Sequence, residues 1–284
     1  AASAVVQTDG TLAVTGTTAL EAGTNISLSE VTNSFGGTVA VSGATDVDLV
    51  GTGGITLGAV ATTGGLSVTA VTGNVGLSGV VSVASLSAVS TAGAITQSGG
   101  SVAVTTGTTN LTAATDITLS QSSNDFASTV NATGRDIDIE DANALTLGAV
   151  NASGSVAVLS TGHLALGGNV QGTLITAASS AGALTAGTLT ATAGAIDLDA
   201  AGAVSLNGNV TSAAAVTVDS SAGAVSQTAG TTLTATGSVV VNAAADVSLA
   251  GAVSAALVDV DATGGSLSVN DLTATSGALT LDAT

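Results

Sequence analysis

The acidic stretch from residue 135 to residue 141 is where neighbouring side chains of this chain could do chemistry together. Its sequence is Arg-Asp-Ile-Asp-Ile-Glu-Asp, in which Asp136, Asp138 and Glu140 alternate with two isoleucines. Because side chains alternate across a β-strand, these three carboxylates share one outward face. Ca²⁺ takes carboxylate oxygens as ligands, so Asp136, Asp138 and Glu140 are the candidate calcium ligands. Solvated acids on a strand face are the alternative interpretation.

Paired carboxylates could also serve as the acid and base of a β-helical enzyme that cleaves acidic polysaccharides. The other side chains argue against catalysis, because the chain has one histidine, one arginine and no lysine, cysteine or tyrosine. His163 follows Gly162 just outside a predicted buried pair, and we expect it to be an exposed corner residue. The sequence therefore predicts no catalytic residue and no cofactor, with Ca²⁺ as the one exception to consider.

The charge of the chain excludes several classes of partner. The formal net charge is -18, with 19 acidic residues against the single basic residue Arg135. Binding to a phosphate backbone or an anionic membrane relies on lysine and arginine, so neither nucleic acid nor such a membrane is an expected partner. The sequence has no apolar run long enough to span a bilayer, so we expect no membrane insertion. The absence of cysteine leaves an extracellular location open.

Short strands must position these side chains. Pairs of apolar residues separated by one small residue recur throughout, which predicts strands with one buried face. Helices are disfavoured because 38 glycines and many β-branched residues interrupt every helical window. Representative pairs are Leu12/Val14, Ile26/Leu28, Val47/Leu49, Ile117/Leu119, Ile137/Ile139, Ile196/Leu198 and Val216/Val218.

A corner motif of the form apolar-x-Leu, then glycine, then valine sets the period. Its leucines are residues 57, 77, 147, 166, 206 and 249, and four of the five intervals are one or two multiples of about 20 residues. The period predicts an all-β fold, a right-handed parallel β-helix (solenoid) with three short faces per rung. At about 20 residues per rung, residues 1–284 make about 14 rungs of one solenoid. We also expect this solenoid to be a segment of a longer chain.

A longer repeat lies over the short one. Residues 11–60 align with residues 101–150, and Phe35 and Phe126, the two phenylalanines of the chain, are equivalent in this alignment. The intervals from Leu28 to Leu57 and from Leu119 to Leu147 are both longer than one rung of about 20 residues. We therefore expect enlarged, phenylalanine-containing rungs near residues 28–57 and 119–147.

Three motifs carry a resemblance to a known family. The element Ala-[Ile/Val]-x-Gln-x-x-Gly occurs at residues 4–10, 94–100 and 224–230, beside the Asn-[Ser/Asp]-Phe insertion and the Leu-x-Leu-Gly-Ala-Val corner. Together they resemble the repeat shafts of bacterial filamentous haemagglutinin-like large exoproteins, the two-partner secretion adhesins. The resemblance implies a right-handed β-helical shaft that is secreted through a partner outer-membrane pore and used in adhesion or biofilm formation.

The predicted function is that of a structural shaft of a secreted bacterial surface protein, an adhesin or extracellular fibre, without catalysis. Expected partners are copies of the chain or further repeats stacked end to end, and cell-surface ligands of modules outside this segment. The main alternative is a subunit of an end-to-end stacked extracellular filament. An ice-binding β-helix is a further alternative, but Thr190, Thr234 and Thr273 recur on alternate rungs, so we expect their ladder to be interrupted.

Overall fold

The computed structural model describes residues 3–284, and every regular element among them is a β-strand. The strands pair in parallel and form β-solenoid coils of about 20 residues, about 14 rungs in all. Two compact units divide the chain, one ending at Ala142 and the other covering Asn143–Thr284. Within the described residues, no helix is long and apolar enough to cross a membrane. The all-β parallel solenoid is confirmed, whereas a single solenoid over residues 1–284 stays a prediction.

In the first unit the chain passes repeatedly around three faces. The strands β9, β10 and β11 make one rung, β12 to β14 the next, and β15 to β17 the one after. The longer strand β8 covers two faces, because it pairs with both β10 and β11. The strands are β1 (Val5–Val6), β2 (Ala13–Val14), β3 (Thr18–Glu21), β4 (Ile26–Leu28), β5 (Ser34–Phe35), β6 (Thr38–Ala44), β7 (Val47–Gly51), β8 (Ile55–Thr62), β9 (Gly65–Ala70), β10 (Val75–Leu77), β11 (Val81–Val83), β12 (Ser85–Ser90), β13 (Ile95–Gln97), β14 (Val102–Val104), β15 (Thr109–Ala113), β16 (Ile117–Leu119), β17 (Asp125–Phe126), β18 (Thr129–Gly134) and β19 (Ile137–Asp141).

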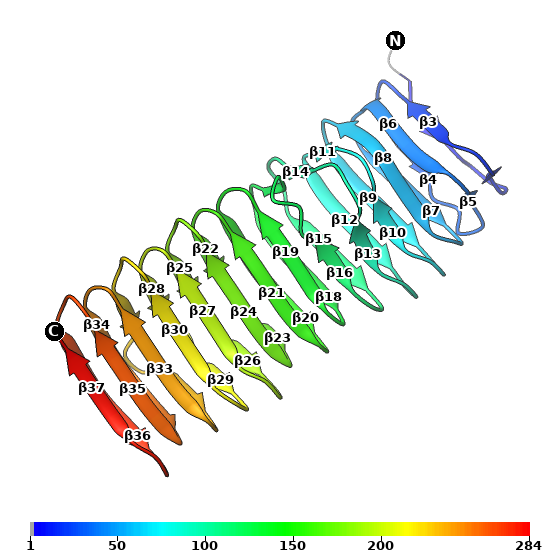
Figure 1. Ribbon diagram of the computed structural model, residues 1–284. Coiled ribbons are helices and arrows are strands. Elements are labelled where there is room, and N and C mark those ends of the chain that lie inside the picture. The colour runs from blue at the N-terminus through cyan, green and yellow to red at the C-terminus, as the bar shows by residue number, and fades with distance from the viewer. Residues whose placement is uncertain (1–2) are drawn as a thin grey trace. The chain divides into compact units, whose positions relative to one another are not determined.

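The second unit repeats the same plan. In Figure 1 the strands β24, β27, β30, β33, β35 and β37 lie side by side, one from each successive rung. The strands are β20 (Leu145–Ala152), β21 (Ser155–Ser160), β22 (Leu164–Leu166), β23 (Val170–Gly172), β24 (Leu174–Ser179), β25 (Leu184–Ala186), β26 (Leu189–Ala191), β27 (Ile196–Ala200), β28 (Val204–Leu206), β29 (Val210–Ser212), β30 (Val216–Ser220), β31 (Val225–Gln227), β32 (Thr232–Ala235), β33 (Ser238–Ala243), β34 (Val247–Ala255), β35 (Leu257–Ala262), β36 (Leu267–Ala274) and β37 (Leu279–Ala283).

The core of each unit consists of columns of aliphatic side chains that stack from rung to rung. One column of the first unit is fully buried and contains Ile55, Val75, Ile95, Ile117 and Ile137. Branched aliphatic side chains pack well on a pleated sheet, and parallel strands bring identical positions within about 4.8 Å of each other. The alternation that buries one column leaves the next residue of each strand outside, where the polar side chains lie.

The long repeat does not enlarge a rung. Leu28 lies opposite Leu49 and Leu119 lies opposite Ile139, so each of these two rungs has an ordinary length. The interval from Leu28 to Leu57 therefore spans one rung and one further face, which corrects the expected enlargement near residues 28–57 and 119–147. Both phenylalanines nevertheless lie in the core, as Phe35 and Phe126 are buried.

Each copy of the long repeat is instead rotated by one face. Ile26 stacks through Val47, Leu66 and Leu86 to Thr109, which is four rungs later. Its equivalent in the sequence, Ile117, belongs to β16, the next strand around the same rung. The segment from Ile26 to Ile117 thus makes four rungs and about one third of a fifth.

Candidate functional site

The predicted calcium ligands lie along β19 and the corner before it. Asp136, Asp138 and Glu140 are all partly exposed on the outward face, as the alternation predicts. They follow one another along a single strand, where residues i and i+2 are about 6.6 Å apart. Burial raises the pKa of Asp138, and a hydrogen bond from Ser120 partly opposes that rise. Among residues 3–284, the group of three carboxylates that lie close enough together to hold a metal ion consists of other residues.

Arg135 is held by the acids of two successive rungs. Its Nε donates to Asp116 Oδ1 at 2.8 Å, and its Nη2 forms an ion pair with Asp116 Oδ2 at 2.5 Å. A second ion pair joins Arg135 Nε to Asp136 Oδ2 at 3.2 Å. The hydrogen bond and charge of Asp116 are the main causes that raise the pKa of Arg135. The arginine therefore neutralises two carboxylates that the stacking of rungs brings together.

The three acids that do converge are in the second unit. One oxygen each of Asp197, Asp199 and Asp219 lies within 4.8 Å of the others. Asp197 and Asp199 project from β27, while Asp219 projects from β30 and is the register partner of Asp199. The signal in the sequence was the interval from Asp199 to Asp219, which equals one rung. Asp219 adds a carboxylate one rung, about 4.8 Å, from Asp199, so that this group combines a neighbour across rungs with a neighbour along the strand.

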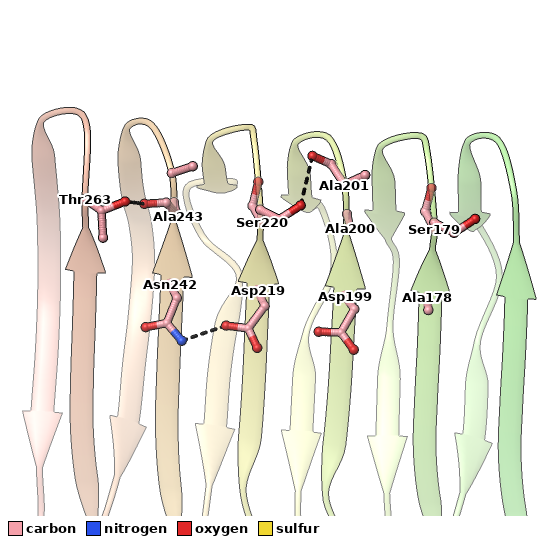
Figure 2. Close-up of a pocket in the computed structure, with 13 residues that line it drawn as sticks. Ala178, Ser179, Asp199, Ala200, Ala201, Asp219, Ser220, Asn242, Ala243 and Thr263 are labelled. Carbon is pink, nitrogen blue, oxygen red and sulfur yellow. Dashed lines mark hydrogen bonds between the residues drawn. The ribbon is translucent and has the colours of Figure 1, made fainter.

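A column of acidic and amide side chains continues from this group along the unit. Successive rungs place Asp199, Asp219, Asn242, Asp261 and Asp282 in register. Figure 2 shows the first three on neighbouring strands, with Asn242 directed toward Asp219. Asn242 Nδ2 donates to Asp219 Oδ1 at 2.6 Å, so the amide separates two negative charges.

The same column borders a shallow hollow of about 490 Å³. Its remaining lining is composed of small side chains, among them Ser179, Ser220 and Thr263. Partial burial raises the pKa of Asp199, and the charges of Asp197 and Asp219 raise it further. Burial, followed by the charge of Asp219, also raises the pKa of Asp197. Protonation of one carboxylate, or a bound cation, would relieve the repulsion between Asp197, Asp199 and Asp219.

His163 lies at a corner and is exposed, as predicted. Its Nε2 is 3.4 Å from Thr185 Oγ1, one rung further on. A threonine hydroxyl does not orient or activate an imidazole as a carboxylate does. The geometry gives His163 a surface contact rather than the surroundings of a general base.

One outward column of the second unit carries a hydroxyl on every rung, but Ser254 interrupts its run of threonines, so the ladder is interrupted at one rung and not, as expected, at alternate rungs. Thr211 and Ser254 fill the rungs between the three threonines of the repeated motif, and the outward column runs Thr190, Thr211, Thr234, Ser254 and Thr273. The repeated leucine-threonine motif does not reveal these two residues, because valine precedes each of them. A second hydroxyl column begins at Thr185, but the corner between the two columns changes in length from rung to rung. Thr185 precedes Thr190 by five residues, whereas the corresponding Ser226 precedes Thr234 by eight.

Two amide pairs, the first partly buried and the second buried, explain the motifs that contain Gln and Asn. In the first pair Gln7 Nε2 donates to Asn33 Oδ1 at 2.9 Å, and Asn33 Nδ2 donates to Gln7 Oε1 at 2.7 Å. Asn33 Oδ1 also accepts from the Leu12 amide at 2.9 Å, and Asn33 Nδ2 donates to the Leu28 carbonyl at 3.2 Å. Gln7 Nε2 reaches the Gly10 carbonyl at 3.0 Å as well, where Gly10 has φ 86°.

The second pair has the same connections. Gln97 Nε2 donates to Asn124 Oδ1 at 2.8 Å, and Asn124 Nδ2 donates back to Gln97 Oε1 at 2.9 Å. The backbone partners of Asn124 are the Val102 amide at 2.9 Å and the Leu119 carbonyl at 3.0 Å. All four hydrogen bonds that an asparagine side chain can make are formed, although Asn124 is 0% exposed. We call each pair, Gln7–Asn33 and Gln97–Asn124, an amide clamp.

The segments of this chain that match a protein-family model contain these clamps. A family model described as repeats of unknown function (DUF5649) matches residues 1–42 and 78–133. The first segment contains the Gln7–Asn33 clamp and Phe35, and the second contains the Gln97–Asn124 clamp and Phe126. The chain is a repeat protein. Neither a curated protein nor a solved structure matches it significantly.

Proposed function

We propose that this chain is the structural shaft of a secreted bacterial surface protein, an adhesin or extracellular fibre, and that it acts without catalysis. The observation that carries the proposal is the uniformity of each unit, in which rung after rung presents the same buried columns. Each rung contacts only its neighbours, so such a coil can grow in length without a new core. The resemblance of its motifs to filamentous haemagglutinin-like exoproteins supports secretion to the cell surface.

The surface chemistry supports the same proposal. With 19 acidic residues and one basic residue, neighbouring copies repel each other and a long secreted chain stays soluble. Four acids of the second unit, Asp199, Asp219, Asp261 and Asp282, follow one column, and no basic or aromatic residue of the described chain lines the hollow beside it. A shaft of this kind projects or connects other modules, which would make the contacts with cells or surfaces.

A rung deletion tests the shaft. Removing residues 204–224 takes out one rung and places Val225 where Val204 was, because these two residues are register partners. Spin labels at Thr185 and Ser248, which lie in one outward column, should then move closer by about 4.8 Å, the spacing of parallel strands. A deletion that unfolds the unit, or one that leaves the distance unchanged, would refute interchangeable rungs.

Two further measurements test the biological part of the proposal. Antibodies raised against the chain should label intact cells of the source bacterium in immunogold micrographs, and label confined to the cytoplasm would contradict secretion. Sedimentation velocity at rising concentration separates the shaft from the alternative, a subunit of an end-to-end filament. A filament subunit gives growing polymers, whereas a shaft segment with a net charge of -18 sediments as one species.

A further inference from the structure

The buried columns of these units do not by themselves fix which residues of successive rungs pair. A slip of two residues returns every inward side chain to the core, because the side-chain period of a strand is two. In this chain such a slip exchanges one aliphatic residue for another. At β13 and β16, for example, Ile95 would exchange Ile117 for Leu119 as its partner.

The corners do not fix the register either, because they absorb changes in length. The rung from Leu145 to its register partner Leu164 has 19 residues, whereas the rung from Ile95 to its register partner Ile117 has 22. A corner that can gain or lose two or three residues elsewhere can also do so during folding. The register needs a contact whose chemistry is not interchangeable.

We propose that the amide clamp is a register lock, which selects the rung pairing of the repeat by matching one glutamine to one buried asparagine. Gln97 lies in an inward column with Leu77, and Asn124 lies level with Val102, five residues beyond Gln97. A two-residue slip separates the amides and leaves both buried without each other. Loss of such buried hydrogen bonds disfavours the slipped register by a factor on the order of 100.

The lock also links three successive rungs. The side chain of Asn124 binds the preceding rung through Gln97 and Val102, while its backbone carbonyl accepts from the Ala142 amide of the following rung at 2.8 Å. Asn33 does the same, with its carbonyl accepting from the Thr52 amide at 2.7 Å. Because the two clamps lie on different faces, each copy of the repeat sets the register at a new point around the coil.

Gln227 provides an internal control, because it has the glutamine of the clamp without the asparagine. It occupies the column of Leu206 and Leu249 and is 4% exposed. On the rung that follows, Ala252 is the register partner of Thr232, five residues beyond Gln227, and Val253 comes next, so no asparagine is present where the clamp would have it. The Gln227 Nε2 reaches only backbone carbonyls at 3.3 Å, and its Oε1 has no hydrogen-bond partner.

Engineered disulfides measure the register directly, since the chain contains no cysteine. Thr96 and Thr118 are register partners on the outward face, so the pair Thr96→Cys and Thr118→Cys reports the native register. Thr96→Cys with Ser120→Cys reports a slip of two residues, because in the native register these Cα atoms are about 8 Å apart, too far for a disulfide. Each pair is unfolded, refolded and oxidised, and the fraction of disulfide is measured.

Gln97→Leu should raise the yield of the slipped disulfide at least tenfold, while the matched change Gln227→Leu leaves it unchanged. An unchanged ratio of the two disulfides in the Gln97→Leu chain would overturn the proposal. If that chain fails to fold, the exchanged pair Gln97→Asn with Asn124→Gln keeps both amides in the core and decides the question. Amide pairing then predicts recovery of the native disulfide, and failure of this variant to recover it would also overturn the lock.

Discussion

The substitution Asn242→Asp should destabilise the second unit at neutral pH, because it completes an unbroken column of five carboxylates. The new charge would lie one rung, about 4.8 Å, from both Asp219 and Asp261. Coulomb repulsion at that distance in a water-like dielectric is about 1 kcal/mol per pair, and salt and exposure reduce it. Loss of the 2.6 Å hydrogen bond from Asn242 to Asp219 adds about 1 kcal/mol. The expected loss in free energy of unfolding is about 2 kcal/mol in total.

Urea unfolding at pH 7 and pH 3 separates the two contributions, and Asn242→Ala is the matched control. The control removes the hydrogen bond without adding a charge, so its destabilisation should be about half as large at pH 7. At pH 3 the introduced carboxyl is mostly protonated, and the difference between the two variants should disappear. Raising the salt concentration at pH 7 should narrow the same difference. Equal effects of Asn242→Asp at both pH values would refute the argument from repulsion.

Asp199 of the column and Asp197, its neighbour on β27, give a pH dependence of the same sign. Burial and neighbouring charge raise the pKa of Asp199 and Asp197 above the ordinary range of an aspartate. A folded state that holds these protons more tightly than the unfolded state is favoured at low pH. Its stability therefore falls as the pH rises from the unfolded value through the raised folded values. Asp199→Asn should flatten this fall, and hydrogen exchange of the β27 and β30 amides should report it.

Three further outcomes are expected. Gln97→Leu should lower the free energy of unfolding in urea by about 1–2 kcal/mol, because it leaves the amide of Asn124 without its partner. Gln227→Leu should raise the same quantity by about 1–2 kcal/mol, because it removes a buried oxygen that has no hydrogen-bond partner. Gly100→Ala should cost more in the same assay than Gly230→Ala, since both glycines have positive φ but only at Gly100 would the new methyl group meet the backbone of the preceding rung. Arg135→Gln should speed hydrogen exchange at the corner before β19 at pH 7, because it removes both ion pairs and leaves the charges of Asp116 and Asp136 facing each other, and added salt should reduce the increase.

The strands of this fold could be predicted from the sequence because each one carries the pattern within itself. Ile137 and Ile139, for example, are separated by an outward aspartate, and both lie in the core. Alternation of this kind depends only on local geometry, which every strand obeys whatever its neighbours are. The period of the rungs could also be predicted from the sequence, because the chain must come back to the same face before the next rung can stack on the previous one.

The pairing between rungs was harder to predict, because it depends on residues that are not adjacent in sequence. The acids Asp136, Asp138 and Glu140 were conspicuous as a run, yet a strand spreads them out. Asp219 was inconspicuous in the sequence, yet stacking brings it to Asp197 and Asp199. The threonine ladder followed the same rule, as its intermediate members come from segments without the expected motif. In each case the partner lies one rung away and not along the strand.

The rotation of the long repeat explains why counting residues alone misplaces such partners. After one long repeat the same motif occurs again in the sequence, but it lies on a different face of the coil, because the repeat covers four rungs and about a third of another. Two copies of one motif can therefore present their side chains on different sides of the coil, as β4 and β16 do. A fixed interval identifies neighbours only when it equals a whole number of rungs. The amide clamps combine one rung with one corner: Asn124 lies one rung beyond Val102, which follows Gln97 by five residues, and Asn33 lies one rung beyond Leu12, which follows Gln7 by five.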